Sequence, residues 1–184
     1  MPLLRPDVTL TPLELSHAAN MLEWLADPAV RDGIGLRSRP TPQSTHDWIA
    51  HAQQDATIRP FAIMLGVGHV GNVVLDKIDL HLQTTRFSIY VGHPSARGAG
   101  VGRSAAILAL REAFLNLNLH KVWLTVHAEN HTAIASYLRI GFVPEGMHRD
   151  EFLLQGRRLP ALYMGILDEE FQRCQRAIAA ESES

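Results

Sequence analysis

Glycine residues crowd one short turn of the chain, Arg97–Gly102, which contains Gly98, Gly100 and Gly102. A strand-like run, Phe87–Val91, comes before this turn, and a long apolar segment follows it. Glycine lets the backbone approach a ligand with no β-carbon in the way. A helix that starts here would point its unpaired N–H groups and its positive dipole end at the same place. The sequence therefore predicts a site for a pyrophosphate and, with it, a nucleotide-type cofactor.

Two common phosphate-binding patterns fit this turn poorly. The Walker pattern requires a lysine after the last glycine, where this chain has Arg103. The dinucleotide fingerprint is matched by Gly100, Gly102 and Ala105, with Glu129 where a ribose-binding acid belongs. That match makes a nicotinamide dinucleotide oxidoreductase one alternative. A doubly wound fold, however, needs more strand–helix repeats than the flanking segments supply.

A second group of residues follows about thirty positions later, at Asn130, Tyr137, Gly141 and Phe142. Each of them has a plain structural explanation when it is taken alone. Asn130 fits the N-cap of a helix, Tyr137 fits a core position, and Gly141 fits a helix C-terminus. The glycine turn alone could likewise be an ordinary turn. It is the joint occurrence of both groups, at this spacing, that indicates a function.

The two groups together resemble the signatures of the GNAT superfamily of N-acetyltransferases. Residues Arg97-x-x-Gly100-x-Gly102 resemble its pyrophosphate loop, and 130–142 resemble its N-x-x-A-x-x-x-Y-x-x-x-G-F segment. Residues 142–146 are similar to the branch that includes ribosomal-protein and amino-sugar acetyltransferases. The resemblance covers roughly Val8–Leu167. It implies an acetyl-CoA-dependent N-acetyltransferase whose acceptor amine attacks directly in a ternary complex; the alternative is a non-catalytic acetyl-CoA-binding module.

The resemblance also assigns roles to matching positions. Backbone N–H groups of the turn would bind the coenzyme A pyrophosphate, and the charge of Arg97 would approach the phosphate oxygens. The fourth strand would separate from the fifth after Tyr90–Gly92, and its free groups, with Asn130, would bind the pantetheine. The N–H of Val91 would stabilise the oxyanion, and Tyr137 would act as general acid. The predicted acetyl-CoA-binding residues are Tyr90, Val91, Gly92, Arg97, Gly98, Ala99, Gly100, Val101, Gly102, Arg103 and Asn130.

The general base stays open at this point. Some members of the family carry a glutamate on the fifth strand, where this chain has Thr125. The remaining candidates near the expected cleft are Asp76, His93, His127 and Glu129, or a bound water that relays the proton to one of them. No metal is expected, because a change from strand to helix separates His127 from the next histidine, His131.

The acceptor is expected to be a primary amine of a small molecule or a protein N-terminus. In this fold its pocket would be built by the segments 27–39 and 148–158, which are rich in arginine. Arginines suit a phosphate or carboxylate, so an amino sugar nucleotide or an amino-acid-like amine would fit. A polyamine would require an acidic pocket, which these segments do not clearly form.

The surrounding elements are predicted from hydrophobic periodicity and from turn residues. The order is β-α-α-β-β-β-α-β-α-β, with an antiparallel first half and one central β-α-β unit. The fold class is α/β of mixed α+β type, a GNAT-like mostly antiparallel sheet of six to seven strands with helices on both faces. Trp48 and Ile49 are expected to point inward, and Arg31–Pro40 to form a loop. The predicted elements are strands at 8–10, 61–65, 70–75, 87–91, 121–126 and 161–167, and helices at 14–26, 41–56, 101–118, 132–139 and 168–180.

Composition sets the outer limits of the prediction. The 184 residues fit one domain, 1–168, followed by a C-terminal helix and disordered tail at 169–184. A net charge of −2 gives no reason to expect nucleic acid, and the absence of a long apolar run gives none to expect a membrane. The one cysteine, Cys174, forms no internal disulfide and fits a reducing compartment, so a cytoplasmic location is expected. A homodimer is left open.

Overall fold

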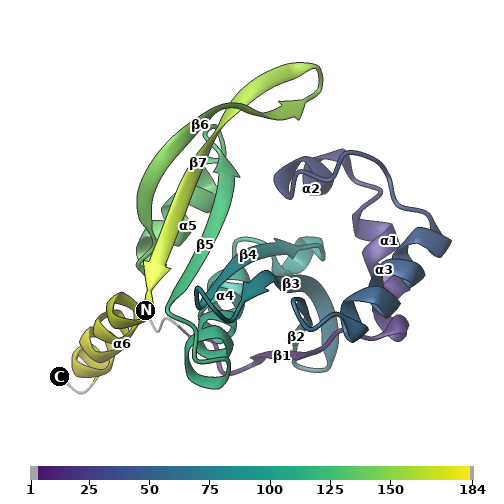
Figure 1. Cartoon of the computed structure of the whole chain (residues 1–184). Helices are drawn as coiled ribbons and strands as arrows, with labels where there is room; N and C mark the ends of the chain where they lie inside the picture. The colour runs from purple at the N-terminus through teal and green to yellow at the C-terminus, as the bar shows by residue number, and fades with distance from the viewer. Residues whose placement is uncertain (1–3, 183–184) are drawn as a thin grey trace.

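One seven-stranded sheet organises the molecule, in the order β1-β2-β3-β4-β5-β7-β6 (Figure 1). The computed structural model describes residues 4–182, so residues 183–184 of the predicted disordered tail lie outside the described residues. All neighbouring strands are antiparallel except β4 and β5. The strands are β1 (Val8–Pro12), β2 (Arg59–Leu65), β3 (Gly68–Asp79), β4 (Thr84–Val91), β5 (Lys121–His127), β6 (Val143–Leu154) and β7 (Arg157–Leu167).

Helices cover both faces of the sheet. The helices are α1 (Ala18–Trp24), α2 (Pro28–Gly33), α3 (Pro42–Gln54), α4 (Val101–Arg111), α5 (His131–Ile140) and α6 (Asp168–Ser182). Ile63 of β2 lies in the main core with α4, whereas its neighbours Ala62 and Met64 pack in a smaller core with α1 and α3. Since successive strand residues point to opposite faces, α4 and α1–α3 lie on opposite sides of the sheet. The predicted fold class is confirmed.

The first half of the sheet follows the sequence closely. Glycine-rich residues 66–68 connect β2 and β3 as a hairpin, as predicted. Ile49 is fully buried, but Trp48, predicted to point inward, keeps 37% of its surface exposed. A helix of this kind buries a stripe rather than a whole side, and residues next to each other in sequence lie about 100° apart around its axis.

Helix α2 occupies part of the segment that we expected to be a loop. Asp27 and Pro28, interpreted as the end of the preceding helix, instead begin α2. The Asp27 carboxylate accepts the Ala29 N–H at 2.9 Å, and Pro28 occupies the first turn. This is an N-cap followed by proline, whose fixed φ suits a first helical turn.

Strand β6 was missed, so the predicted single last strand is a hairpin of β6 and β7. Almost every side chain of β6 is exposed, so its sequence lacks the alternation of apolar and polar residues that marks a half-buried strand. Its pairing with β7, rather than its own pattern, makes it a strand. The hairpin extends well beyond the rest of the sheet (Figure 1).

Helix α6 belongs to the same core as the sheet. Phe171 is 1% exposed and packs on Phe114, with ring centroids 5.3 Å apart. The helix reaches Ser182, two residues beyond its predicted end. No helix within residues 4–182 is long and apolar enough to cross a membrane.

Candidate functional site

The two parallel strands separate soon after they meet. Pairing between β4 and β5 is confined to Thr84–Arg86 and Lys121–Trp123. Beyond these residues the facing edges of both strands have no partner strand, and we call the resulting gap the strand opening. It begins at Phe87, earlier than the predicted position after Tyr90–Gly92. An aromatic cluster lies at this point. The ring of Phe142 is tilted against that of Phe87 and forms a T-shaped contact with that of Tyr137, with centroids 6.2 and 5.7 Å apart.

At the far end of β4, the backbone of Val91 faces the strand opening. The Gly92 N–H donates to the Val70 oxygen of β3 at 2.9 Å, so it points away from the opening. Successive N–H groups of a strand point to opposite sides, which directs the Val91 N–H toward β5. Of the three predicted residues Tyr90, Val91 and Gly92, therefore, Val91 offers a free donor to a ligand.

Gly92 is required for a different reason. A β-carbon at this position would collide with the ring of Trp24, because α1 packs directly on the end of β4. Tyr90 lies on the same face, with its ring 6.4 Å from that of Trp24. Its hydroxyl is buried and has no hydrogen-bond partner in the part of the chain that the structure describes, and burial raises the pKa of Tyr90.

The glycine turn forms a backbone cradle at the N-terminus of α4. Gly98 and Gly100 have φ of +73° and +80°, and Gly100 is the N-cap residue in the left-handed conformation. Within residues 4–182, the N–H groups from Gly98 to Arg103 donate to no protein acceptor. Free N–H groups at the positive end of an eleven-residue helix are suited to a diphosphate. The predicted residues Ala99, Val101 and Gly102 are part of this cradle.

Two arginines border the cradle and one turns away from it. The Nε of Arg103 is buried and has no hydrogen-bond partner within residues 4–182, so its N–H is available to donate to an anion. The guanidinium of Arg5 donates to the backbone oxygen of Ala99 at 2.9 Å, and the backbone N–H of Arg5 donates to the Ser104 hydroxyl at 2.9 Å. No pattern in the sequence marks Arg5, since it lies far from the turn along the chain.

Arg97 has a different position from the one we expected. Its guanidinium donates to the carbonyl oxygens of Val91 and Gly92, at 3.0 and 2.7 Å. It therefore holds the end of β4 in place instead of reaching toward the cradle. This contact fixes the backbone that carries the Val91 N–H.

Helix α5 brings Asn130 and Tyr137 to the strand opening. The Asn130 side-chain oxygen accepts the Ala133 N–H at 3.1 Å, so Asn130 is the N-cap, and its amide N–H groups stay available for a ligand. Gly141 ends the helix with φ of +114°. Tyr137 contacts Phe87 edge to face, and burial raises the pKa of Tyr137 to about 12. A phenol with this pKa is protonated at neutral pH and is able to donate a proton.

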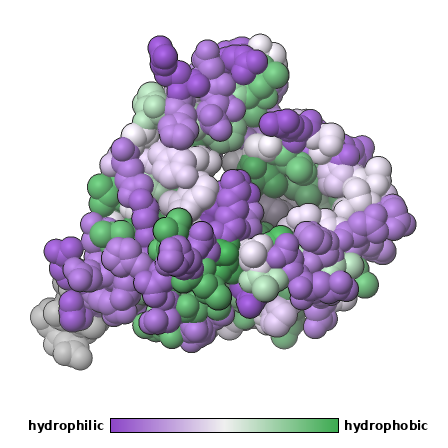
Figure 2. All heavy atoms as spheres, viewed as in Figure 1, coloured by the Kyte–Doolittle hydropathy of each residue, from purple (hydrophilic) through white to green (hydrophobic). Residues whose placement is uncertain are grey.

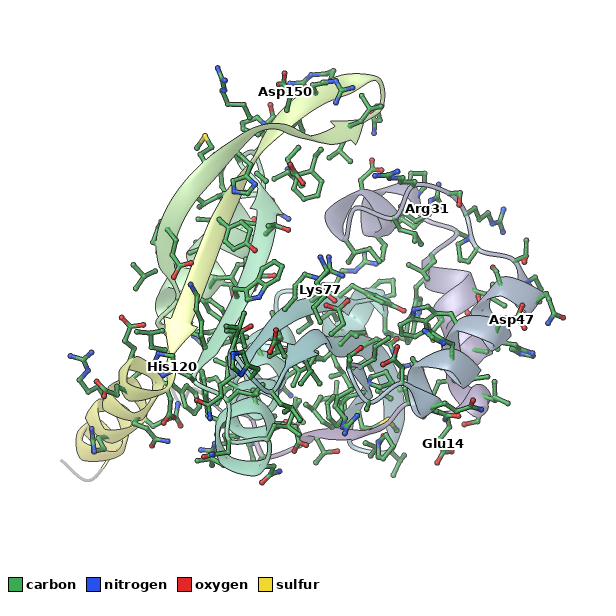
Figure 3. All side chains as sticks on the ribbon, in the orientation of Figure 1. Glu14, Arg31, Asp47, Lys77, His120 and Asp150 are labelled. Carbon is green, nitrogen blue, oxygen red and sulfur yellow. The ribbon has the colours of Figure 1, made fainter. Side chains whose placement is uncertain are left out.

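A pocket of about 380 Å³ lies at the end of β5, and we call it the hairpin pocket. Figure 2 shows the surface hollowed between the β6–β7 hairpin and α2, and in Figure 3 Asp150 and Arg31 mark the two sides of this gap. Arg157 binds Glu129 at 2.8 Å and Gln155 binds Asp32 at 3.3 Å, both at the pocket wall. The lining residues are Ala29, Asp32, Gly33, His127, Glu129, Asn130, Leu154, Gln155, Arg157 and Leu159.

The four candidate bases fall into different surroundings. Asp76 accepts hydrogen bonds from Arg86, with a shortest contact of 2.5 Å, so its charge is already neutralised. His93 is exposed and lies 2.9 Å from the Ser95 hydroxyl. His127 and Glu129 both line the hairpin pocket. Among the described residues, no cluster of three or more His, Cys, Asp or Glu side chains could hold a metal ion.

Three of the six arginines in the segments 27–39 and 148–158, which we expected to bind an anionic acceptor, are engaged elsewhere. Arg31 donates to the oxygens of Leu25 and Ala26, at 2.6 and 2.8 Å, at the end of α1. Arg158 donates to the Asp150 oxygen within the hairpin. Arg157 is bound to Glu129, so these three side chains are less available to an anionic acceptor.

Comparison with known proteins gives the family. The model of the acetyltransferase (GNAT) domain matches residues 7–143. This chain belongs to the GNAT acetyltransferase family. The segment matched contains both the strand opening and the cradle, and it ends just after the helix that carries Tyr137.

Named relatives of this GNAT chain act on polyamines. A spermidine N(1)-acetyltransferase of Vibrio cholerae is 35% identical over 102 residues, and one of Escherichia coli K12 is 32% identical over 117 residues. The alignments cover 55% and 64% of this chain, and 58% and 62% of the two relatives, so the chain spans about three fifths of their length. A crystal structure of spermidine N-acetyltransferase from Vibrio cholerae in complex with CoA and spermine has a TM-score of 0.86, at 25% identity, covering 91% of this chain and 99% of that one.

Proposed function

We propose that this protein is an acetyl-CoA-dependent N-acetyltransferase that transfers an acetyl group to a primary amine of a small molecule. The observation that carries the proposal is the strand opening, which has the backbone cradle of α4 at one side and the hairpin pocket at the other. A donor and an acceptor could approach each other from these two sides. The family match and the named relatives support the same reaction class.

The chain's own residues fit coenzyme A. The cradle from Gly98 to Arg103 would bind the pyrophosphate, with the buried Nε of Arg103 as an added donor. The free edge of β4 would pair with the amide groups of the pantetheine arm, as a strand edge pairs with an extended chain. The amide of Asn130 would bind the same arm. When bound, acetyl-CoA supplies an activated thioester.

Two groups would assist the transfer. The Val91 N–H would donate to the carbonyl oxygen as negative charge develops on it. Tyr137 would donate its proton to the leaving sulfur, since its phenol is held in the protonated form. Cys174 lies in α6 against Gly141, so it does not serve as a nucleophile at the strand opening. The acceptor nitrogen would therefore attack directly in a ternary complex.

For the acceptor, an alkyl polyamine is the first class to test. The two relatives are named for spermidine, and three of the six arginines that favoured an anionic acceptor are engaged in the fold. Asp32, whose only described partner is the neutral Gln155, leaves a carboxylate at the pocket wall that suits an ammonium group. Amino sugars and protein N-termini remain the competing acceptors.

Ligand-dependent stability tests the donor first. Thermal unfolding is measured with acetyl-CoA, CoA, NADH and NADPH, because a ligand at 100 times its Kd stabilises the fold by about 2.7 kcal/mol, or a Tm increase of about 5–10 °C. We expect an increase with the two coenzyme A ligands only. A thiol-release assay then compares spermidine, glucosamine and a peptide with a free N-terminus. A Tm increase with NADH, or no thiol release with any amine, contradicts the proposal.

A further inference from the structure

His127 lies on the face of β5 that looks away from the main core. Val122, Leu124 and Val126 are buried in that core, whereas Trp123, Thr125 and His127 alternate with them and face the side of α1–α3. Strand β5 ends at His127, four residues beyond its last pairing with β4. The imidazole therefore lies at the strand opening, where it lines the hairpin pocket.

The strand register places His127 close to the level of Val91. The last registered pair of the parallel strands is Arg86 with Trp123. Four residues further along each strand, β4 reaches Tyr90, which is the residue before Val91, and β5 reaches His127. Since the Val91 N–H is the expected donor to the reacting carbonyl, an amine that attacks there from the hairpin pocket passes beside the imidazole.

The surroundings of the imidazole fix its orientation but leave one nitrogen free. Phe152 of β6 contacts the ring edge to face, with centroids 5.9 Å apart. The Nδ1 atom is buried and has no hydrogen-bond partner among the described residues. A buried nitrogen without a partner is costly, and its presence in a pocket wall is expected where a ligand completes the hydrogen bond.

The charged groups around His127 are few and come from three segments. Asp32 of α2, Glu129 after β5 and Arg157 of β7 line the same pocket, and Arg157 is bound to Glu129. The two carboxylates favour the charged imidazolium, but burial outweighs them and lowers the pKa of His127 below its ordinary value. The side chain is therefore neutral at pH 7, in the state that accepts a proton.

We infer that Nδ1 of His127 is the proton acceptor for the amine substrate, an inference that rests on the proposed function. A protonated amine gives one proton to His127, which frees the lone pair of the nitrogen. That lone pair forms the C–N bond to the acetyl carbon as the C–S bond breaks, and the sulfur takes the proton of Tyr137. The second proton lost by the nitrogen restores the Tyr137 hydroxyl, and His127 releases its own proton to water.

The test compares His127→Ala with His120→Ala in the full chain. His120 is exposed and precedes the other end of β5, as Figure 3 shows, so its loss controls for removal of a histidine next to the same strand. For His127→Ala we expect kcat/KM to fall about 100-fold or more at pH 7. The measurement uses whichever of spermidine, glucosamine and the peptide releases thiol fastest, and acetyl-CoA affinity is measured by calorimetry as a check on folding.

Two further readouts separate proton transfer from a structural effect. In the wild-type enzyme, kcat/KM should decrease as pH falls through the pKa of His127. This acidic limb of the pH profile should be absent from His127→Ala. Added imidazole should restore part of the rate in His127→Ala and none in His120→Ala. If acetyl-CoA binding is retained while the acidic limb and the rate are unchanged, the inference is overturned and the proposed function stands. If the wild-type chain acetylates no amine, the inference and the proposed function are both contradicted.

Discussion

The glycine cradle at α4 and the hairpin pocket at β5 differ in how their residues are distributed along the chain. The cradle is made by one continuous run, Gly98–Arg103, whose backbone conformation sets the positions of the donor groups. The hairpin pocket is assembled from α2, the end of β5 and both strands of the last hairpin, which lie more than a hundred residues apart at the extremes. The cradle is therefore a local structure, whereas the hairpin pocket exists only when the sheet is complete.

This difference shows how much each side of the site can vary. A cradle of backbone N–H groups tolerates side-chain changes as long as its glycines keep their conformations. The pocket depends on individual side chains such as Asp32 and His127, so a few substitutions can change its acceptor. The comparison predicts that changes in the cradle alter donor binding alone, and that a change at Asp32 in the pocket alters acceptor use alone.

The largest effect is expected at Tyr137, which packs against Phe87 where the strand opening begins. Tyr137→Phe keeps the aromatic packing with Phe87 and Phe142 but removes the proton donor. We expect kcat to fall by about 100-fold or more while the Kd for acetyl-CoA is unchanged. Steady-state kinetics and calorimetry measure the two quantities. Because its pKa is raised to about 12, Tyr137 should cause no loss of rate at any pH below about 10 in the wild type.

A change in the cradle should affect the donor next most strongly. Gly100→Val places a branched side chain at φ of +80°, inside the space for the phosphates. We expect the Kd for CoA to rise about 100-fold, or about 2.7 kcal/mol. The matched control is Gly66→Val, at φ of +59° in the β2–β3 hairpin, which carries similar strain with open space around it. Equal CoA affinity in both variants would contradict the assignment of the cradle.

A change in the pocket should affect the acceptor more modestly. Asp32→Asn removes the negative charge of the pocket wall but keeps a similar shape. We expect KM for spermidine to rise about 5- to 10-fold, with kcat and acetyl-CoA affinity unchanged, because a partly exposed ion pair is worth about 1 kcal/mol. Asp47→Asn, on the exposed surface of α3, is the control. A matching loss of CoA affinity in Asp32→Asn would show that the two sides of the site are not separate.

The smallest effect is expected in the free energy of unfolding, and it concerns the residues that support the end of β4. His69 lies between His17 and Trp24, with ring centroids 4.5 and 4.8 Å away, and burial lowers its pKa to about 4. A histidine whose pKa is lower in the folded state stabilises the fold above its ordinary pKa of about 6.5. That stability is lost as pH falls from about 6.5 toward 4. Urea unfolding at pH 7 and pH 5 should show a smaller pH dependence in His69→Gln than in the wild type.

The sequence alone predicted the parts of this protein that are local. The run of glycines 98–102, the cap residues Asn130 and Gly141, and the hairpin at residues 66–68 depend on backbone conformation within a few residues, so their spacing carried the information. The family resemblance of these motifs supplied the site residues around them. Trp48 was predicted incorrectly and helix α2 was not predicted, because the burial of a side chain and a short capped helix depend on neighbours that hydrophobic periodicity does not describe.

Only the tertiary structure decided how the two sides of the site face each other. The contact of Arg5 with the cradle and the meeting of Asp32 with His127 in the hairpin pocket join segments far apart in the chain. The exposed strand β6 and the turn of Arg97 onto the carbonyls of β4 involve nearby segments, but no periodic pattern in the sequence marks them either. The proposed acceptor side of this protein is therefore a property of the fold, whereas its proposed donor side is already present in a single run of the chain.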